Sequence, residues 1–468
     1  MTWSRRSVLS GGSAAILAGA VPRRAWAKTE ADVIIVGAGL SGLLAARTLE
    51  AAGLKCLVLE GERRIGGRLH TLDDLPGKPE AGGIQIGSGY KRLHALAKAT
   101  GIALREGAAY GVGAADSQSG LFHINGTTVN ADDWKTSPAN RLSETERGTL
   151  PNALAFLAGG KMPRLDSPNA WMQADPSLDI SVDAALRQAG LSAEARRLVE
   201  ANFNGNTLAS MSQVNLMRTA AIFRAGPGPV FTVSGGSQRL PEAMAGTLKS
   251  PVRLGQIVSA IEEDETGVRV VANGRSLHTR HAICTIPFAV LRSIHLAGNF
   301  GVDMATMIAS LNYTRASFAF VEAREPFWKA DGFPETLWTD DPWLGRVFAV
   351  SESPPLLKVW TRGAGADLLD RATPDQARAE IVRRIENARP SAQGKLGQVH
   401  LFSWQKNPMA RGIYHHIGTG QSATLASATQ EKGKRLHFAG EHLAQASSGM
   451  EGALESGERA ALALLAAA

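Results

Sequence analysis

The chain has 468 residues and a formal net charge of +7, from 50 Lys and Arg residues against 43 Asp and Glu residues. This length is enough for two domains with sizeable cores. No dense basic run interleaves with aromatic residues, so the composition argues against a nucleic-acid partner.

The first residues have the pattern of an export signal. Residues 4–9 (SRRSVL) precede a small, apolar stretch over residues 11–21, and residues 25–27 (AWA) offer a cleavage site. This pattern predicts a twin-arginine signal peptide over residues 1–27 and a periplasmic location. The apolar run is shorter than the roughly 20 residues that span a bilayer, so we expect no stable membrane span. Removing residues 1–27 lowers the net charge from +7 to +3.

A glycine-rich turn follows the signal. Residues 32–36 (DVIIV) are mostly β-branched and predict a buried parallel strand. In the turn, Gly37 permits a tight bend, Gly39 lets the backbone approach a pyrophosphate, and Gly42 lets the next helix pack closely. That helix, expected over residues 40–52, directs its N-terminal amides at the phosphates. The predicted cofactor-binding residues of this unit are Gly37, Gly39, Leu40, Ser41 and Gly42.

An acidic residue completes the motif. A second strand over residues 55–59 ends on Glu60, eighteen residues beyond Gly42. An acid is expected there to hydrogen-bond a ribose hydroxyl of a dinucleotide. An acid rather than an arginine argues against a ribose 2′-phosphate.

Further glycine-rich segments identify the dinucleotide. Residues 63–71 (RRIGGRLHT) and 80–87 (EAGGIQIG) follow the first motif, and residues 436–441 (LHFAGE) and 449–461 (GMEGALESGERAA) lie near the other end of the chain. Together these segments resemble the flavin-containing amine oxidase family, which includes monoamine, polyamine and L-amino acid oxidases. The last segment is especially similar to the monoamine oxidase C-terminus. The resemblance implies that both chain ends surround one FAD.

The resemblance also implies a fold and further cofactor contacts. The fold class is α/β: a doubly wound, Rossmann-type FAD-binding domain interleaved with an α+β substrate-binding domain. We expect the FAD-binding domain to comprise residues 30–95, 230–292 and 398–468, and the substrate domain to comprise residues 96–229 and 293–397. The additional residues expected to contact FAD are Arg68, Gly83, Ile84, Val258, Gly440, Glu441 and Met450.

The pattern of the middle of the chain predicts individual elements. Residues 258–261 and 267–271 read as a hairpin, and residues 282–287 as a strand that returns under the cofactor. Residues 181–189 and 374–388 look helical, whereas residues 316–321 and 356–361 look like strands.

The substrate side departs from the family pattern. Monoamine oxidases hold the amine between two aromatic rings; Tyr414 matches the first, but Gly449 stands in place of the second. Trp404 or Trp360 could fill the gap. Ile413 stands where some monoamine oxidases carry a flavin-bonded cysteine, so we expect noncovalent FAD.

Two charged residues of related enzymes are absent. Gln85 replaces the arginine that binds the substrate carboxylate in L-amino acid oxidases, although another arginine could serve. Phe318 stands where many family oxidases carry a lysine linked to reaction with oxygen; a shifted alignment would place Arg315 there. We therefore expect the electron acceptor to be oxygen or a periplasmic electron carrier, and the missing lysine makes the carrier a real option.

Cysteine and histidine usage indicates neither a disulfide nor a metal. Cys56 and Cys284 lie in apolar, strand-like runs, which favours small buried side chains. His415 and His416 would face opposite sides of a strand, so we predict no metal site.

These observations lead to a hypothesis of function. The protein is expected to be an exported FAD-dependent amine oxidase or dehydrogenase that converts a primary or secondary amine to an imine, which hydrolyses to an aldehyde or ketone. Its candidate catalytic residues are Tyr414, Trp404 and Gln85. The alternatives are an L-amino acid oxidase, a carbon–carbon desaturase or porphyrinogen oxidase-like enzyme, and a non-enzymatic flavin protein. A homodimer stays open as an assembly.

Overall fold

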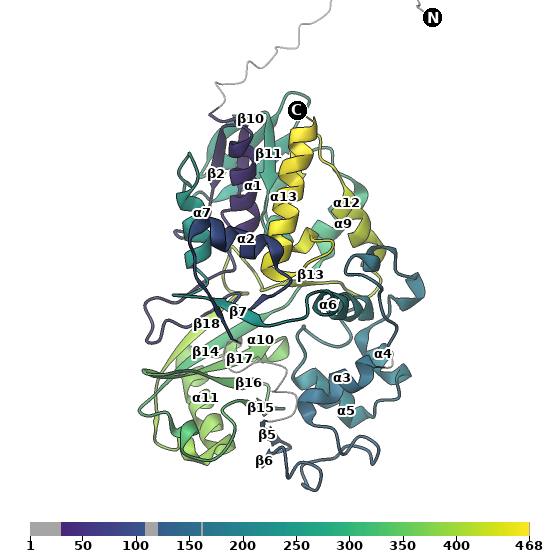
Figure 1. Cartoon of the computed structure of the whole chain (residues 1–468), viewed down its shortest axis with the longest axis vertical. Coiled ribbons are helices and arrows are strands. Elements are labelled where there is room, and N and C mark those ends of the chain that lie inside the picture. Colours follow the sequence, from purple (N-terminus) through teal and green to yellow (C-terminus); the bar gives the residue numbers. More distant parts are fainter. Residues whose placement is uncertain (1–29, 108–119, 161, 468) are drawn as a thin grey trace, which may run out of the picture.

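The computed structural model describes residues 30–107, 120–160 and 162–467. The predicted signal peptide lies outside the described residues. The fold is mixed α/β, with a small parallel sheet at one end, a large sheet at the other, and a group of helices beside the large sheet (Figure 1).

The parallel sheet brings together segments from distant parts of the sequence. All its neighbouring strands are parallel. Their order is β2 (Cys56–Leu59), β1 (Val33–Val36), β11 (His281–Cys284) and β20 (Leu436–Phe438). Every residue of β1 and β2 is buried, as the runs of β-branched and apolar residues predict. Helix α1 (Leu40–Ala51) follows β1 and ends before Gly53, whose φ of +90° suits glycine.

The C-terminal helix packs directly on α1. Helix α13 (Gly449–Ala467) lies alongside α1 at the same end of the molecule (Figure 1). A Cβ on Gly457 would lie 2.3 Å from the carbonyl oxygen of Ser41, so the two helices approach closely only because Gly457 has no side chain. The Ser456 hydroxyl accepts from the Gly440 amide at 2.7 Å and donates to its carbonyl at 2.6 Å. These contacts join the two ends of the described chain.

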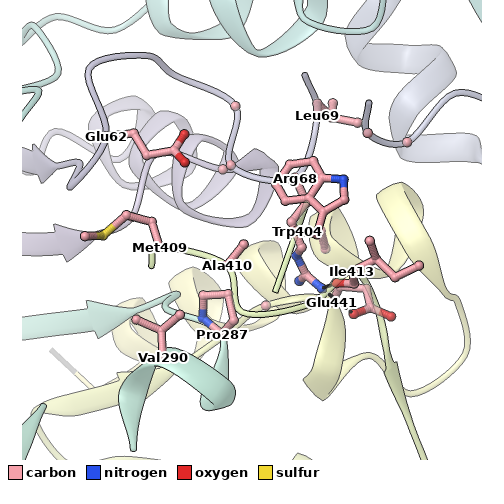
Figure 2. A pocket seen from close by; sticks show the side chains of 18 of the residues that line it. Glu62, Arg68, Leu69, Pro287, Val290, Trp404, Met409, Ala410, Ile413 and Glu441 are labelled. Carbon is pink, nitrogen blue, oxygen red and sulfur yellow. Dashed lines mark hydrogen bonds and ion pairs between the residues drawn. The ribbon is translucent and has the colours of Figure 1, made fainter. Parts of the chain in front are cut away.

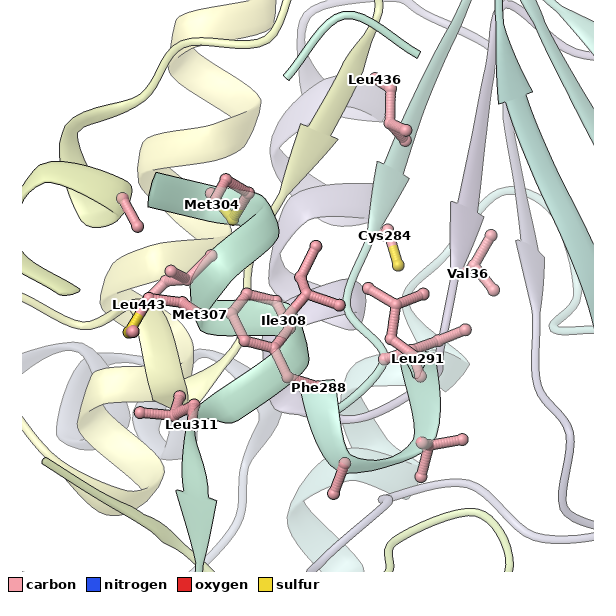
Figure 3. Packing of buried hydrophobic residues seen from close by; sticks show 14 of the residues in the cluster. Val36, Cys284, Phe288, Leu291, Met304, Met307, Ile308, Leu311, Leu436 and Leu443 are labelled. Atoms are coloured by element: carbon pink, nitrogen blue, oxygen red, sulfur yellow. The ribbon is translucent and has the colours of Figure 1, made fainter. Parts of the chain in front are cut away.

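A second, four-stranded sheet contains the expected hairpin. Its order is β10 (Arg275–Thr279), β9 (Val268–Ala272), β8 (Val258–Glu263) and β12 (His295–Ala297), and β8 pairs antiparallel with β9. Helices α8 (Phe288–Leu291) and α9 (Val302–Ser310) follow in the chain. Figure 3 shows Met304, Met307 and Ile308 of α9 packed against Phe288 and Leu291. Burying each such side chain contributes about 1.5–3 kcal/mol.

The large sheet has seven strands. Their order is β18 (Leu396–Ser403), β14 (Ala316–Ala323), β17 (Pro355–Arg362), β16 (Arg346–Glu352), β15 (Leu337–Thr339), β5 (Leu121–Ile124) and β6 (Thr127–Asn130). Trp360 lies opposite Phe318 on one side and opposite Arg346 on the other. Lys358 lies opposite Phe320 of β14 on one side and opposite Phe348 of β16 on the other. Because opposite residues, and alternate residues along a strand, point to one face, all six side chains share that face.

One expected domain boundary does not fit this sheet. Residue 398 was expected to begin the last FAD-binding segment, but it lies inside β18, which pairs with β14 over most of its length. Its backbone hydrogen bonds therefore assign β18 to the large sheet. The rest of the proposed division remains a prediction.

The remaining elements are further helices and two small sheets. Helix α11 (Pro374–Ala388) has the bounds expected from the sequence and begins with a capping box between Thr373 and Gln376. The small sheet consists of β3 (Ile86–Gly87), β7 (Val230–Val233) and β4 (Leu104–Glu106), and β13 (Asn312–Tyr313) pairs with β19 (His415–His416). The other helices are α2 (Lys91–Thr100), α3 (Leu154–Gly159), α4 (Val182–Gln188), α5 (Ala193–Ala201), α6 (Gln213–Ala225), α7 (Arg239–Gly246), α10 (Ala364–Arg371) and α12 (Ser422–Gln430). Within the described ranges, no helix is long and apolar enough to cross a membrane.

Candidate active site

A cavity of about 720 Å³ extends from the glycine-rich turn after β1 to one face of the large sheet. It is lined by fifteen of the sixteen residues predicted as cofactor-binding or catalytic: Gly37, Gly39, Leu40, Ser41, Glu60, Gln85, Arg68, Gly83, Ile84, Val258, Trp404, Tyr414, Gly440, Glu441 and Met450. The exception is Gly42. Segments from across the chain thus converge on one cavity.

The three glycines of the turn have different surroundings. Gly37 has a φ of +110°, and a Cβ there would lie 2.3 Å from the Thr285 hydroxyl. A Cβ on Gly42 would lie 2.0 Å from the Gly37 carbonyl oxygen, so Gly42 serves helix packing instead of lining the cavity. A Cβ on Gly39 would meet no protein atom within 4 Å. Because Gly39 lines the cavity, its bare backbone leaves room for a bound group.

The start of α1 suits a phosphate. The α1 N-terminus has no side-chain cap, so its first amides are open to a ligand. Ser41 lines the cavity, and its hydroxyl is buried with no hydrogen-bond partner in the protein. Buried polar groups normally have a partner, and a phosphate oxygen would supply one. This part of the cavity therefore fits the diphosphate of a dinucleotide.

Glu60 lies at the end of β2 as the motif predicts. Its Oε2 accepts from the Ala38 amide at 2.7 Å, and its Oε1 accepts from the Glu62 amide at 2.9 Å. Burial raises the pKa of Glu60, and these two amide hydrogen bonds act in the opposite direction. The carboxylate is thus held beside the turn, and each oxygen keeps a lone pair for a further donor.

Arg68 and Glu441 form an ion pair inside the cavity. Arg68 Nη1 lies 3.3 Å from Glu441 Oε2 and also donates to the Ile413 carbonyl (Figure 2). Glu441 Oε1 is 2.9 Å from His415 Nδ1. Burial alone would raise the pKa of Glu441, but His415 and Arg68 outweigh it and hold the pKa at about 2. The pair connects the segment around Tyr414 to the turn after β20.

The N-terminus of α13 faces the same cavity. Gly449 and Met450 line it, and Gly449 has a φ of +56°. A Cβ on Gly449 would lie 3.3 Å from the Tyr90 hydroxyl, so a large ring at position 449 has no room on that side. The missing second cage ring is consistent with this crowding. The helix N-terminus favours negative charge in the cavity.

Aromatic side chains line the sheet end of the cavity. The aromatic residues that line this end are Tyr414, Trp404, Phe318, Phe348 and Trp360. Trp404 is fully buried, and its indole donates to the Ala81 carbonyl at 2.6 Å. Trp360, one of the two expected substitutes for the cage ring, lies on the face of the sheet that lines the cavity. This end of the cavity suits an apolar or aromatic group.

Sequence reasoning missed a lysine at this end. Lys358 lines the cavity, its Nζ donates to the Glu80 carbonyl at 2.7 Å, and it lies 4.2 Å from the Phe318 ring centre. Burial lowers the pKa of Lys358 to about 7, although the charge of Glu80 raises it. The segment around Phe318 lacks a lysine, as noted, but the neighbouring strand supplies one. The sequence signal that could have revealed Lys358 is a lysine within the mostly apolar run of β17. Arg315, the other expected counterpart, instead pairs with Asp367 at 2.9 Å.

Two buried arginines were also missed. Arg346 of β16 lines the cavity, and Arg362 of β17 donates to Asn204, another lining residue. Both are 9% exposed. A charged residue within a predicted strand is the sequence signal that could have revealed each arginine. The sequence does not show that β16 pairs with β17, and this pairing brings the two arginines together.

The described residues contain neither a metal-binding cluster nor a disulfide. No group of three or more His, Cys, Asp or Glu side chains there could hold a metal ion. Cys56 and Cys284 are free, buried and absent from the cavity lining.

Comparisons with known proteins agree with this site. A family model described as flavin containing amine oxidoreductase matches residues 40–465. The chain is 25% identical to a flavin-dependent L-tryptophan oxidase from Lentzea aerocolonigenes, over 91% of this chain and 96% of that protein. It is 24% identical to flavin-containing amine oxidase A from Bos taurus, over 93% of this chain and 85% of that protein.

A solved structure shares the fold. Cyclohexylamine oxidase from Brevibacterium oxydans superimposes with a TM-score of 0.76 at 24% identity, covering 93% of this chain and 98% of that one. The glycine turn, the unpartnered Ser41 hydroxyl and the converging chain ends fit the cofactor of this family. The chain therefore belongs to the flavin-containing amine oxidoreductase family and is a flavin-dependent amine oxidoreductase that uses FAD.

Proposed function

We propose that this protein is an exported FAD-dependent amine oxidase or dehydrogenase acting on a primary or secondary amine. The observation that carries the proposal is the single cavity, which has a phosphate-receptive turn at one end and an aromatic sheet face at the other. FAD, when bound, supplies the hydride acceptor for the substrate carbon. The resulting imine hydrolyses to an aldehyde or ketone.

The chain's own residues bind and orient the amine. Tyr414, Trp360 and Phe318 offer ring faces that exclude water and hold an apolar substrate. The α13 N-terminus stabilises negative charge that develops in the cavity during reaction. Gln85, which also lines the cavity, hydrogen-bonds the substrate in this proposal.

The finer features of the cofactor site belong to the same proposal. The β1–turn–α1 unit is a Rossmann-type motif in which Ser41 and the first α1 amides hold the diphosphate and Glu60 holds the ribose. Arg68, Glu441 and Val258 contact other parts of FAD. Binding is noncovalent, because Ile413 lines the cavity and neither described cysteine does.

Export by the twin-arginine pathway to the periplasm is supported by residues 1–27 alone. The acceptor is oxygen or a periplasmic electron carrier. Lys358 beside Phe318 weakens the argument against oxygen, which rested on a missing lysine. Mixing the anaerobically reduced enzyme with air in stopped flow separates the two: flavin that stays reduced for minutes indicates a carrier.

An anaerobic bleaching screen tests the proposed reaction. The purified mature holoenzyme is mixed with a panel of amines and amino acids, and absorbance near 450 nm is followed. We expect bleaching by at least one class of amine, with ammonia or a smaller amine among the products. Bleaching by none of them would overturn amine oxidation and favour carbon–carbon desaturation.

An amino acid substrate is the second candidate. The relative from Lentzea aerocolonigenes is named an L-tryptophan oxidase. Gln85 cannot bind a carboxylate by charge, so this candidate requires a cation elsewhere in the cavity.

A further inference from the structure

A chain of buried polar side chains leads away from the FAD cavity. Glu441 lines the cavity, and its Oε1 lies 2.9 Å from His415 Nδ1. On the other side of the same ring, His415 Nε2 lies 3.4 Å from Arg218 Nη1. All three side chains are buried, and neither His415 nor Arg218 lines the cavity. The chain therefore links a cavity residue to a cation in the protein interior.

The hydrogen-bonding capacity of the three groups sets the direction of each contact. A guanidinium only donates hydrogen bonds, so His415 Nε2 accepts from Arg218. The ring proton then lies on Nδ1, which donates to the Glu441 carboxylate. His415 is thus held in one orientation and one tautomer by a partner on each side.

Arg218 is itself held in place on α6. Its Nη2 donates to the Ala444 carbonyl at 2.7 Å and to the Ser447 carbonyl at 2.9 Å, and its guanidinium lies 4.8 Å from the Trp171 ring centre. Burial lowers the pKa of Arg218 to about 10, whereas the charge of Glu441 acts to raise it, so Arg218 stays charged at neutral pH. The same arginine therefore contacts both the polar chain and the loop that precedes α13.

This loop is fixed by further side chains. Trp171 Nε1 donates to the Gln445 carbonyl at 2.7 Å, and the Gln445 amide donates to Glu455 Oε1 at 2.7 Å. Helix α13 begins after the loop, at Gly449, which lines the cavity. Arg218 therefore bears on the cavity by two routes, through the polar chain and through the loop.

We propose that His415 is a positioning residue for the flavin: it connects Arg218 to Glu441, and this contact keeps the midpoint potential of bound FAD higher than the Glu441 carboxylate alone would allow. The inference rests on FAD as the cofactor and on the proposed contact of Glu441 with it, and it requires no particular substrate. A carboxylate that shares its charge with a hydrogen-bond donor presents a weaker negative field to the cavity. Reduced flavin is more negative than oxidised flavin, so a weaker field favours the reduced form.

Redox titration of the substrate-free holoenzyme tests this role. In His415→Leu, Glu441 keeps Arg68 but loses its second donor. The pKa of Glu441 is about 2 in the wild type, where His415 and Arg68 outweigh the effect of burial, and the carboxyl stays ionised at pH 8 in the variant. We expect reduced FAD to lose about ten-fold more affinity than oxidised FAD, which lowers the two-electron midpoint potential by about 30 mV.

Two measurements give this result. The potential is read from slow anaerobic reduction beside a reference dye, and the dissociation constant of oxidised FAD is read from flavin fluorescence as FAD is added to the apoprotein. Loss of packing alone weakens both redox states equally. A wild-type potential in His415→Leu would therefore overturn the proposal, even in a less stable variant.

His416→Leu is the matched control. His416 is the neighbour of His415 on β19, is also buried, and lies with Nδ1 3.2 Å from the Thr314 hydroxyl, but it does not line the cavity. We expect this variant to lose stability and to keep the wild-type potential. An equal fall in potential in both leucine variants would assign the effect to packing and reject the role of His415.

His415→Asn is the conservative variant, and it decides the matter if His415→Leu binds no FAD. The shorter amide can donate to Glu441 but does not reach Arg218. We expect a fall in potential in the same direction, from about a three-fold difference in affinity between the redox states. An unchanged potential in His415→Asn would overturn the connection from Arg218.

These outcomes are separate from those of the proposed reaction, because no substrate is present. A shifted potential in an enzyme that no amine bleaches would retain the role of His415 and reject amine oxidation. An unshifted potential in an enzyme that amines bleach would do the reverse.

Discussion

The two ends of the cavity are built in different ways. At the glycine-turn end, four residues within one short stretch of the chain line the cavity: Gly37, Gly39, Leu40 and Ser41. At the sheet end, the pairing of β14, β16 and β17 places Phe318, Arg346 and Lys358 on one face. The turn end thus depends largely on one local motif, whereas the sheet end depends on strand register. The predictions below test whether the two ends are as separable as this comparison implies.

The largest effect is expected from the glycines of the turn. Gly42→Ala would place a Cβ 2.0 Å from the Gly37 carbonyl oxygen, so α1 must shift. We expect a loss of about 3 kcal/mol in the free energy of unfolding, together with loss of FAD. Gly39→Ala meets no protein atom within 4 Å and has an ordinary φ of −77°. It should lose FAD while the apoprotein melts at the wild-type temperature. The flavin content of the two purified variants and the melting temperatures of their apoproteins measure these effects. An equal fall in melting temperature for both variants would refute the idea that Gly42 serves packing and Gly39 serves FAD binding.

The second effect concerns the ion pair between Arg68 and Glu441 inside the cavity. Glu441→Gln leaves Arg68 and His415 without their carboxylate. Because Arg68 is partly exposed and keeps its hydrogen bond to the Ile413 carbonyl, we expect a loss of about 2 kcal/mol in stability. The native pKa of Glu441, about 2, lies below its value of about 4.3 in the unfolded chain. The ionised carboxylate therefore stabilises the wild type fully above about pH 4.3, and this contribution is lost as the pH falls toward 2. Denaturant unfolding from pH 6 to 2 should show a steeper decline for the wild type. Parallel curves for the two proteins would argue against this pairing.

A third, smaller effect concerns Lys358 at the sheet end. Its native pKa of about 7 lies below the unfolded value of about 10.4, so the unfolded chain binds more protons between these values. Wild-type stability should therefore rise from pH 7 to 10 through this group, with the full penalty present below pH 7. Lys358→Met should stabilise the protein by about 1–3 kcal/mol at pH 6 and much less at pH 10. Denaturation at pH 6, 8 and 10 measures the difference; a constant difference would mean that Lys358 does not titrate in this range.

The smallest effect lies outside the cavity. Thr373→Ala removes the capping box of α11, and we expect a loss of about 1 kcal/mol in stability. Flavin content and the rate of flavin reduction should not change. A slower reduction would show that the large sheet transmits changes from α11 to the substrate end.

Local patterns were enough to predict much of the fold. The runs before and after the glycine turn gave β1, α1 and β2, and the capping residues of α11 marked its start. These features depend on neighbouring residues, so sequence periodicity and turn chemistry reveal them. The boundary expected at residue 398 falls inside β18, because the strand that pairs with β18 is β14, more than seventy residues away in the sequence.

The substrate end could be predicted only in part. Tyr414, Trp404 and Trp360 were suspected from a family pattern and do line the cavity. Arg346 and Lys358 were missed, because nothing local to either residue indicates that β16, β17 and β14 pair in this register. The face that a strand presents to a cavity is a tertiary property, set by partners distant in the sequence.

Anaerobic stopped flow with a substrate deuterated at the α-carbon tests the central claim most directly. The account predicts that a protiated amine identified by the bleaching screen reduces the flavin, seen as a loss of absorbance near 450 nm, and that the deuterated form does so several-fold more slowly, because the C–H bond breaks as the flavin is reduced. Flavin that stays oxidised with this substrate and with every other amine would contradict the account.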